Sequence, residues 1–178
     1  MVSNLQEGSQ GKLRKVTVVQ AIDGSLGAYA AGDVVGADDC CTTKAIPWLF
    51  QLAESNGGGG YITRAEIVNE TENQAVQYDL LLFSALPNGE LRDNAANTNP
   101  LKGDRDIYTG KIAFPSSEAK GATVATYTEA TPSTVGNLPL AYQCNPESKI
   151  VQGVLVTNTA YTQTATDDIA ITLYYEPM

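Results

Sequence analysis

The sequence contains no histidine, and this absence bears on function before any motif is considered. Histidine is the commonest acid–base side chain at neutral pH, so Ser-His and Cys-His nucleophilic centres are excluded. It is also a frequent zinc ligand, and three cysteines without histidine do not complete a structural zinc site. We therefore expect no catalytic centre, cofactor or metal site, and favour a structural or binding protein over an enzyme.

Cysteine, positive charge and long apolar runs are scarce as well. Cys40 and Cys41 are adjacent and Cys144 stands alone; this odd set indicates reduced thiols, although a disulfide from Cys144 to either neighbour stays open. The net charge of −9 over 178 residues repels phosphate, which disfavours nucleic-acid binding. No apolar run approaches the roughly 20 residues of a membrane helix, and the polar start lacks a signal-peptide core. We expect a soluble protein made in the cytoplasm.

What the chain does have is a series of short β-type runs separated by Gly, Asn, Pro and Asp. Residues 15–22 and 169–175 alternate between apolar and polar, as half-buried strands do. Residues 149–157 are apolar on both faces, which predicts a central strand covered on both sides. Residues 76–86 begin with one polar face and then become apolar on both. Further strands are expected within residues 29–36, 46–52, 61–68, 110–114, 124–127 and 137–144, the last at a sheet edge because of Pro139.

This pattern predicts an all-β fold: an antiparallel β-sandwich of jelly-roll type with about eight strands. We expect residues 1–14 to form a flexible N-terminal arm and residues 15–178 a single domain. The four glycines at 57–60 predict a mobile loop, and residues 69–74 a hairpin-like turn.

The connection from residue 87 to residue 108 is long, polar and rich in acidic and amide side chains. Connections longer than about 12–15 residues are often functional. Its oxygen-bearing side chains invite a calcium site, but the spacing from Asp93 supplies neither the glycine nor the glutamate that an EF-hand loop requires. Tyrosine is typical of interfaces, and the interface candidates among the nine tyrosines are Tyr108, Tyr127, Tyr161 and Tyr174.

Several short blocks follow one another in an order that resembles a group of tailed-bacteriophage virion proteins, over about residues 16–175. The blocks are residues 28–36 (AYAAGDVVG), 58–62 (GGGYI), 80–85 (LLLFSA) followed by Pro87 and an Asn-rich loop, 108–114 (YTGKIAF), 138–142 (LPLAY) and a closing Ile-Thr-Leu strand. The adjacent cysteines depart from the group's pattern.

The resemblance implies a non-enzymatic virion structural protein of the decoration, cement or head-fibre-base kind. Its partners would be the major capsid protein and other virion proteins. It would form a homotrimer on the capsid surface after assembly in the host cytoplasm. We expect the arm and the long connection to make the contacts, and name Lys12, Arg14, Lys15, Arg92, Asp93, Asn97 and Tyr108.

Two other hypotheses for the function remain open. A β-sandwich with exposed aromatic rings also suits a carbohydrate- or host-surface-binding module on a head fibre, tail or baseplate. A glycan or peptidoglycan hydrolase using a carboxylate pair is the third, although no spacing in the chain requires it.

Overall fold

The computed structural model describes residues 13–37, 46–72, 74–119, 125–133, 137–163 and 167–178. Their regular structure is β-strand apart from two short 3-10 helices, η1 (Gly24–Leu26) and η2 (Lys102–Asp104). No helix in these residues is long and apolar enough to cross a membrane. The strands are β1 (Arg14–Ile22), β2 (Ala28–Tyr29), β3 (Val34–Val35), β4 (Trp48–Gln51), β5 (Gly59–Asn69), β6 (Tyr78–Phe83), β7 (Tyr108–Ala113), β8 (Glu118–Ala119), β9 (Thr126–Ala130), β10 (Leu140–Gln143), β11 (Ile150–Thr157), β12 (Tyr161–Thr162) and β13 (Asp167–Pro177).

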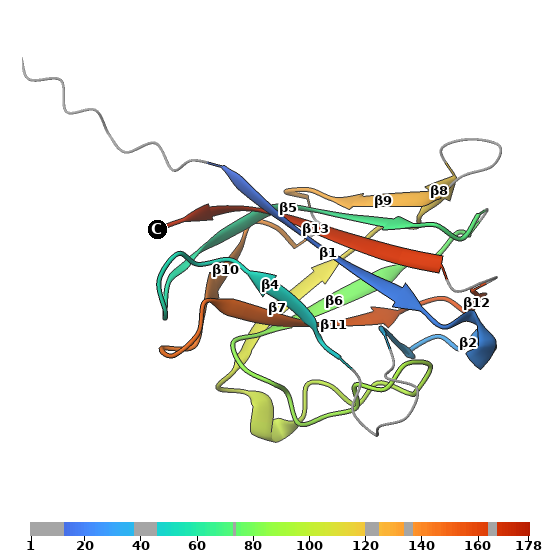
Figure 1. Cartoon of the computed structure of the whole chain (residues 1–178), viewed down its shortest axis with the longest axis horizontal. Coiled ribbons are helices and arrows are strands. Elements are labelled where there is room, and N and C mark those ends of the chain that lie inside the picture. Colours follow the sequence, from blue (N-terminus) through green and yellow to red (C-terminus); the bar gives the residue numbers. More distant parts are fainter. Residues whose placement is uncertain (1–12, 38–45, 73, 120–124, 134–136, 164–166) are drawn as a thin grey trace, which may run out of the picture.

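These strands form two main antiparallel sheets, which Figure 1 shows as two layers. The first sheet has the order β1-β13-β5-β9-β8, and β10 pairs with the beginning of β5. The second sheet has the order β3-β11-β6-β7, and β4 pairs with the beginning of β11. A separate two-stranded sheet joins β2 to β12.

The order of the main strands confirms the jelly roll. Strand β1 pairs with β13, β4 with β11, β5 with β9, and β6 with β7. The first of the eight main strands thus pairs with the last, the second with the seventh, and so on inward, as in a long hairpin rolled into two sheets. Five shorter strands of two to four residues (β2, β3, β8, β10 and β12) bring the total in the described residues above the eight expected.

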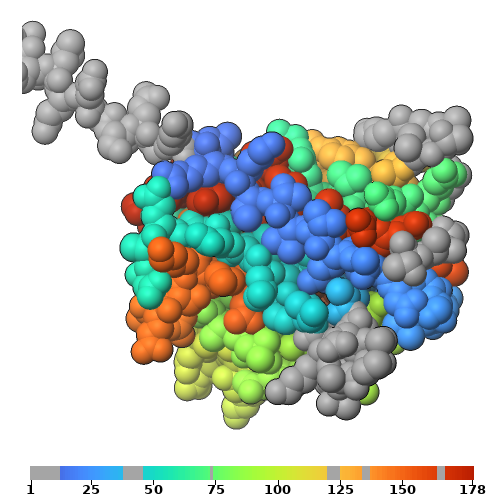
Figure 2. Space-filling view, in the orientation of Figure 1, coloured from blue at the N-terminus to red at the C-terminus, as the bar shows by residue number. Residues whose placement is uncertain are grey.

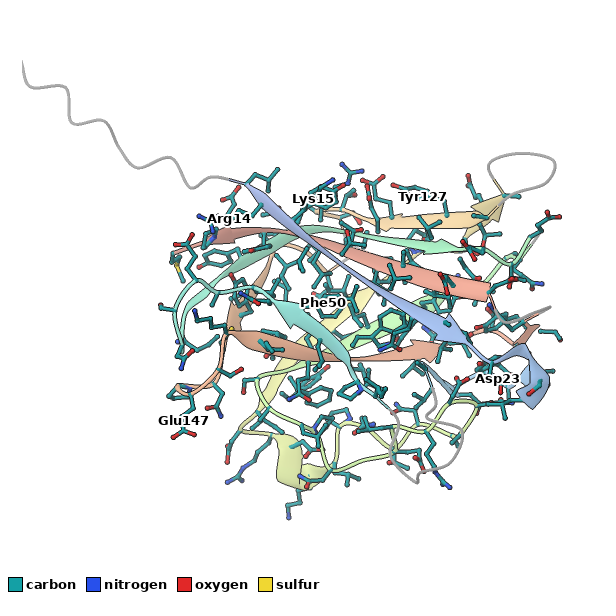
Figure 3. The ribbon with its side chains drawn as sticks, viewed as in Figure 1. Arg14, Lys15, Asp23, Phe50, Tyr127 and Glu147 are labelled. Carbon is teal, nitrogen blue, oxygen red and sulfur yellow. The ribbon has the colours of Figure 1, made fainter. Side chains whose placement is uncertain are left out.

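The main core lies between the two sheets. Side chains such as Ile67 and Ile171 from the first sheet meet Phe50, Leu80 and Leu155 from the second, each at most 1% exposed. Figure 3 shows Phe50 in this interior layer. The alternation along the first sheet arises because successive side chains of a strand point to opposite faces.

A second, smaller apolar cluster lies on the outer face of the second sheet. Its buried members are Val34, Leu81, Phe83, Val154 and Val156, against which Leu91, Ile107 and Tyr108 pack. Strand β11 is therefore covered on both sides, as its sequence predicted, and so is the end of β6.

The layer that covers this cluster is residues 84–107, here called the covering segment. It is tied to β3 and its neighbours by backbone hydrogen bonds: Val34 N donates to Ala95 O at 2.9 Å and Asn94 N to Val34 O at 3.0 Å. The long polar connection is thus an ordered part of the domain, joined to the second sheet by main-chain pairing.

Two local predictions were wrong. The glycine run is not a loose loop: Gly57 makes a turn at φ +71°, and Gly59 and Gly60 open β5 between β10 and β13. A Cβ on Gly60 would overlap the carbonyl oxygen of Glu176, so glycine here allows close approach of two backbones. Residues 69–74 form no hairpin either, because β5 and β6 belong to different sheets.

Candidate functional site

The outer faces of the two sheets differ. That of the second sheet is largely occupied by the covering segment. That of the first sheet, here called the open face, presents side chains of β1, β13, β5 and β9 that are exposed or half-buried. The open face is therefore the surface on which a partner can meet a regular array of side chains.

Strand register arranges the open face in three rows. One row is apolar and aromatic: Val19, Ala170, Val68 and Tyr127 lie side by side. The next is polar, and consists of Thr17, Thr172, Glu66 and Glu129. The third places Lys15 beside Tyr174 and Arg64. With neighbouring strands about 4.8 Å apart, a four-strand row spans about 14 Å.

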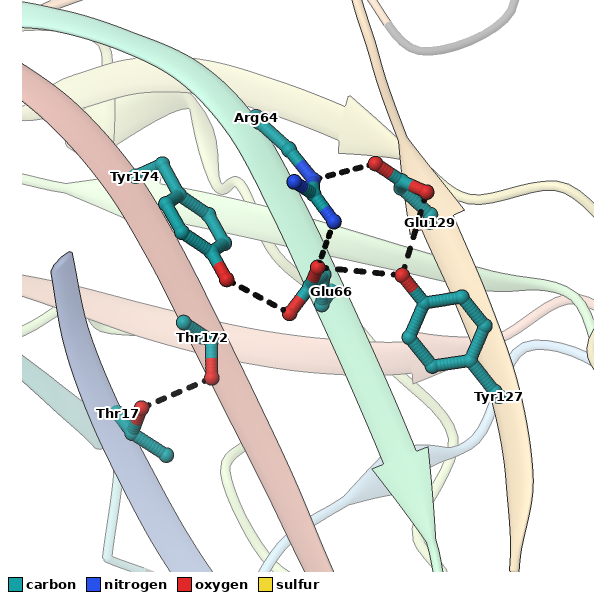
Figure 4. Close-up of polar contacts among 7 residues, drawn as sticks. All are labelled: Thr17, Arg64, Glu66, Tyr127, Glu129, Thr172 and Tyr174. Atoms are coloured by element: carbon teal, nitrogen blue, oxygen red, sulfur yellow. Dashed lines mark hydrogen bonds and ion pairs between the residues drawn. The ribbon is translucent and has the colours of Figure 1, made fainter. Parts of the chain in front are cut away.

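The centre of the open face is a group of five side chains, here called the Arg64 cluster: Arg64, Glu66, Tyr127, Glu129 and Tyr174 (Figure 4). Glu66 and Glu129 are directly opposite each other on β5 and β9, a placement that is unfavourable for like charges. The guanidinium of Arg64 forms ion pairs with both carboxylates. It also lies 4.8 Å from the centre of the Tyr174 ring, within cation–π range.

Two tyrosine hydroxyls complete the cluster. Tyr174 donates to Glu66 Oε2 at 3.1 Å, and the Tyr127 hydroxyl lies 3.2 Å from both Glu66 Oε1 and Glu129 Oε2. Loss of solvent, followed by the neighbouring carboxylate, raises the pKa of Tyr174 above its ordinary value. Loss of solvent likewise raises the pKa of Tyr127. Both hydroxyls are therefore protonated at neutral pH, and each can donate a hydrogen bond to a carboxylate of the cluster.

The carboxylates of the cluster have partners within the protein. The two carboxylates accept from Arg64 and the tyrosines, and they lie on a sheet surface. The nearest hollow, about 230 Å³ at the β8–β9 edge, is lined by Glu129 and Tyr127 but not by Glu66. Among the described residues, no group of three or more His, Cys, Asp or Glu side chains is placed to hold a metal ion.

The residues named from the sequence do not form one site. Lys12 lies outside the described residues. Arg14 begins β1, although it was assigned to the arm, and is ion-paired with Glu54. Lys15 is exposed on the open face, one position along β1 (Figure 3).

The other four lie in or beside the covering segment. Arg92 is paired with Glu90, with its Nε at 3.0 Å and its Nη2 at 2.7 Å from the carboxylate oxygens. The side chain of Asn97 turns back onto Asn99 O at 3.0 Å. Tyr108 begins β7 and packs half-buried against Phe83, with ring centres 5.3 Å apart.

Asp93 has an internal role that its sequence context did not indicate. It is 6% exposed, and its carboxylate accepts from the Tyr29 hydroxyl at 2.8 Å and from Gly36 N at 3.1 Å. Asp104 is similarly enclosed, with Oδ1 accepting from the Asn88 side chain at 2.7 Å. These carboxylates bind protein donors, so the acidic pattern reflects how the segment is fixed in place. We leave Asp93 out of the contact surface.

Of the four tyrosines proposed for interfaces, Tyr127 and Tyr174 lie on the open face and Tyr108 is half-buried. Tyr161 does not fit that prediction: it is 6% exposed and stacks on Tyr29, with ring centres 4.8 Å apart. Sequence reasoning missed Arg64, Glu66 and Glu129. The only signal was the alternation of polar residues along two strands, which does not reveal which strands are neighbours.

Cys144 is a buried free thiol, and burial raises its pKa; Cys40 and Cys41 lie outside the described residues. Comparison with known proteins gives no assignment: no protein-family model and no curated protein matches the sequence.

Proposed function

We propose that this chain is a non-enzymatic structural protein of a tailed-phage virion, and that it binds the outer surface of the capsid lattice through its open face. The observation that carries the proposal is the contrast between the two sheets: one outer face is covered by the chain's own segment, and the other carries an ordered polar cluster beside an apolar row. The resemblance of the sequence to tailed-phage virion proteins is the basis for proposing a virion location and a capsid protein as the partner.

The physical case rests on preorganisation. The side chains of the Arg64 cluster hold one another in place before any partner arrives, so little conformational entropy is lost on docking. The neighbouring row supplies apolar area, with Val19 56% and Val68 37% exposed. This combination of aromatic and apolar contact with fixed polar groups is typical of protein interfaces.

Such a protein would act on the shell by linkage. Binding to the assembled lattice and not to its separated subunits stabilises the assembled state, and oligomerisation of the decorating subunit strengthens attachment through avidity. In this proposal the partners are the major capsid protein and other virion proteins, the subunit is a homotrimer, and the final location is the capsid surface.

The test uses heads purified without this protein and measures how much added protein sediments with them. We expect Val68→Asp to reduce occupancy at least about tenfold, because a carboxylate then enters the apolar row. Leu101→Asp is the matched control, since Leu101 is 41% exposed on the covering segment, and it should bind normally. Equal occupancy for both variants would reject the open face as the contact.

The arm is tested separately. Deletion of residues 1–12 leaves β1, which begins at Arg14, intact. We expect this deletion to lower head occupancy without changing the melting temperature, and unchanged occupancy would remove the arm from the proposal.

One observation favours the carbohydrate-binding alternative. A hollow of about 340 Å³ between β7, β10 and the C-terminal residue is lined by Tyr108 and Tyr142 together with Ser84, Asp106 and Gln143. Its size is within the usual range of small-ligand sites, and rings beside hydroxyl, carboxylate and amide groups suit a sugar. Saturable binding on a glycan array that Tyr108→Ala abolishes would favour this function over lattice attachment.

A further inference from the structure

Strand β1 is an edge strand with one unpaired side. It runs for nine residues without proline, glycine or a register break against β13. Among the described residues, its backbone hydrogen-bonds to β13 alone. Figure 2 shows the strand, in blue, along the front surface of the molecule. An uncovered strand of this length leaves a row of N–H and C=O groups that can pair with another chain.

The side chains of β1 leave apolar surface at the same place. Val16 and Val18 pack against the core, yet both stay only partly buried. Val19, on the opposite side of the strand, is 56% exposed. A free strand edge bordered by three valines is the kind of edge that natural sheets usually shorten, charge or cover.

The charges of this segment indicate which partner could pair with the free edge of β1. Lys15 lies at the beginning of β1 and forms no ion pair with another described residue. Asp23 directly follows the strand and is still extended, at φ −77° and ψ 100°. Hydrogen bonding to Ser25 lowers the pKa of Asp23, so its carboxylate is ionised at neutral pH. The segment therefore has a cation at one end and an anion at the other.

An antiparallel copy of the segment would match these features. With Val19 facing Val19 on a two-fold axis, Lys15 of each copy faces Asp23 of the other, and Thr17 faces Ala21. On the inward side, Val16 faces Ile22. With the two-fold axis perpendicular to the sheet, side chains that point inward in one copy face side chains that point inward in the other, as antiparallel pairing requires. Centring on Val18 instead would place Asp23 opposite an apolar leucine and leave both charges unpaired.

From these observations we propose that β1 is a self-association site. Two copies of the chain pair their β1 strands antiparallel about a two-fold axis at Val19, which joins their first sheets into one continuous sheet. This site uses the free edge of β1, whereas the proposed capsid contact uses the open face of the first sheet. The two share Lys15, Thr17 and Val19, but the self-association proposal does not depend on the capsid contact. It is compatible with a trimer formed through another surface, in which case two trimers would join as a hexamer.

Cysteine cross-linking tests both the contact and its register. The starting protein is the full-length chain with Cys40 and Cys41 replaced by serine. Val19→Cys places two thiols opposite each other, at a Cα separation that a disulfide can bridge. Thr17→Cys is the matched control: it is also exposed on β1, but its two copies would be about 13 Å apart, since each residue advances the strand by about 3.3 Å.

Under mild oxidation we expect the Val19→Cys protein to form a covalent dimer and the Thr17→Cys protein to stay uncross-linked. Adding Ala21→Cys to Thr17→Cys should restore cross-linking, because these two positions face each other in the proposed register. Absence of a Val19→Cys dimer, or equal cross-linking by Thr17→Cys alone, would overturn the proposal.

The mass in solution provides an independent readout. Sedimentation of the unmodified chain should reveal dimers, or hexamers if trimers also form, and a monomer or a lone trimer at every concentration would overturn the proposal. Lys15→Glu and Asp23→Lys should each weaken self-association about tenfold by opposing like charges. The double variant should restore it. Melting temperatures of all three variants show whether the domain is still folded, and a double variant as weak as the single ones would reject the Lys15–Asp23 pairing.

Discussion

Replacement of Asp93 by alanine should destabilise the domain strongly, although Asp93 belongs to a polar connection at the molecular surface. Its carboxylate is the acceptor for two enclosed donors, the Tyr29 hydroxyl at 2.8 Å and Gly36 N at 3.1 Å. Burial, followed by the Asp93 carboxylate, raises the pKa of Tyr29 far above its usual range, so this hydroxyl remains a donor throughout the accessible pH range.

The magnitude follows from the groups left without a partner. A buried donor that loses its acceptor costs about 1–3 kcal/mol, so two donors cost about 4 kcal/mol in Asp93→Ala. That is a large part of the roughly 5–15 kcal/mol that stabilises a typical domain. For a chain of this size it lowers the melting temperature by about 8–16 °C.

The assay is thermal and urea unfolding of the variant beside two controls. Tyr29→Phe removes one donor and leaves Asp93 with its backbone partners, so it should cost about 1–2 kcal/mol. Asp106→Ala removes a carboxylate that is 82% exposed in the same segment, and should change stability by less than about 0.5 kcal/mol. Equal melting temperatures for Asp93→Ala and Asp106→Ala would refute the anchoring role, as would a larger loss in Tyr29→Phe than in Asp93→Ala.

Two further predictions concern stability. Gly60→Ala should lower the free energy of unfolding in urea by about 3 kcal/mol or more, because its Cβ overlaps backbone atoms of the last strand. Gly103→Ala is the control and should change this free energy little, because open space surrounds Gly103. Similar values for the two variants would refute the close approach of backbones at Gly60. Hydrogen bonding to Arg92 lowers the pKa of Glu90 to about 2. Its stabilising contribution is therefore present above about pH 4.5 and lost as the pH falls toward 2. Between pH 5 and pH 2, the free energy of unfolding of the wild type should therefore fall by about 1–2 kcal/mol more than that of Glu90→Gln, after allowance for solvent screening. Parallel pH profiles of the two proteins would refute this.

Features set by local alternation were readable from the sequence. Residues 149–157 carry apolar side chains at odd and even positions, and β11 is indeed covered on both faces. The half-buried pattern of residues 169–175 is the pattern of β13 in the first sheet. In both cases the period of two shows directly which side-chain faces leave water, so the all-β sandwich could be predicted. The jelly-roll type did not follow from alternation; the number of strands and the long connections between them favoured it.

Features that depend on a distant partner were misread or missed. Asp93 looked like a solvated loop acid because its main partner, Tyr29, is 64 residues away in the sequence. The glycines before β5 looked mobile because the strands that hold them, β10 and β13, come much later in the chain.

The sequence by itself determined that this chain folds as an antiparallel sandwich, since burial and strand alternation are local properties of the residues. Tertiary structure alone decided which sheet face stays open, and that Arg64, Glu66, Tyr127, Glu129 and Tyr174 meet there. The physical reason is that strand pairing brings together positions whose separation in sequence carries no trace of the contact. The same pairing leaves β1 with one row of backbone groups that no described part of the chain hydrogen-bonds.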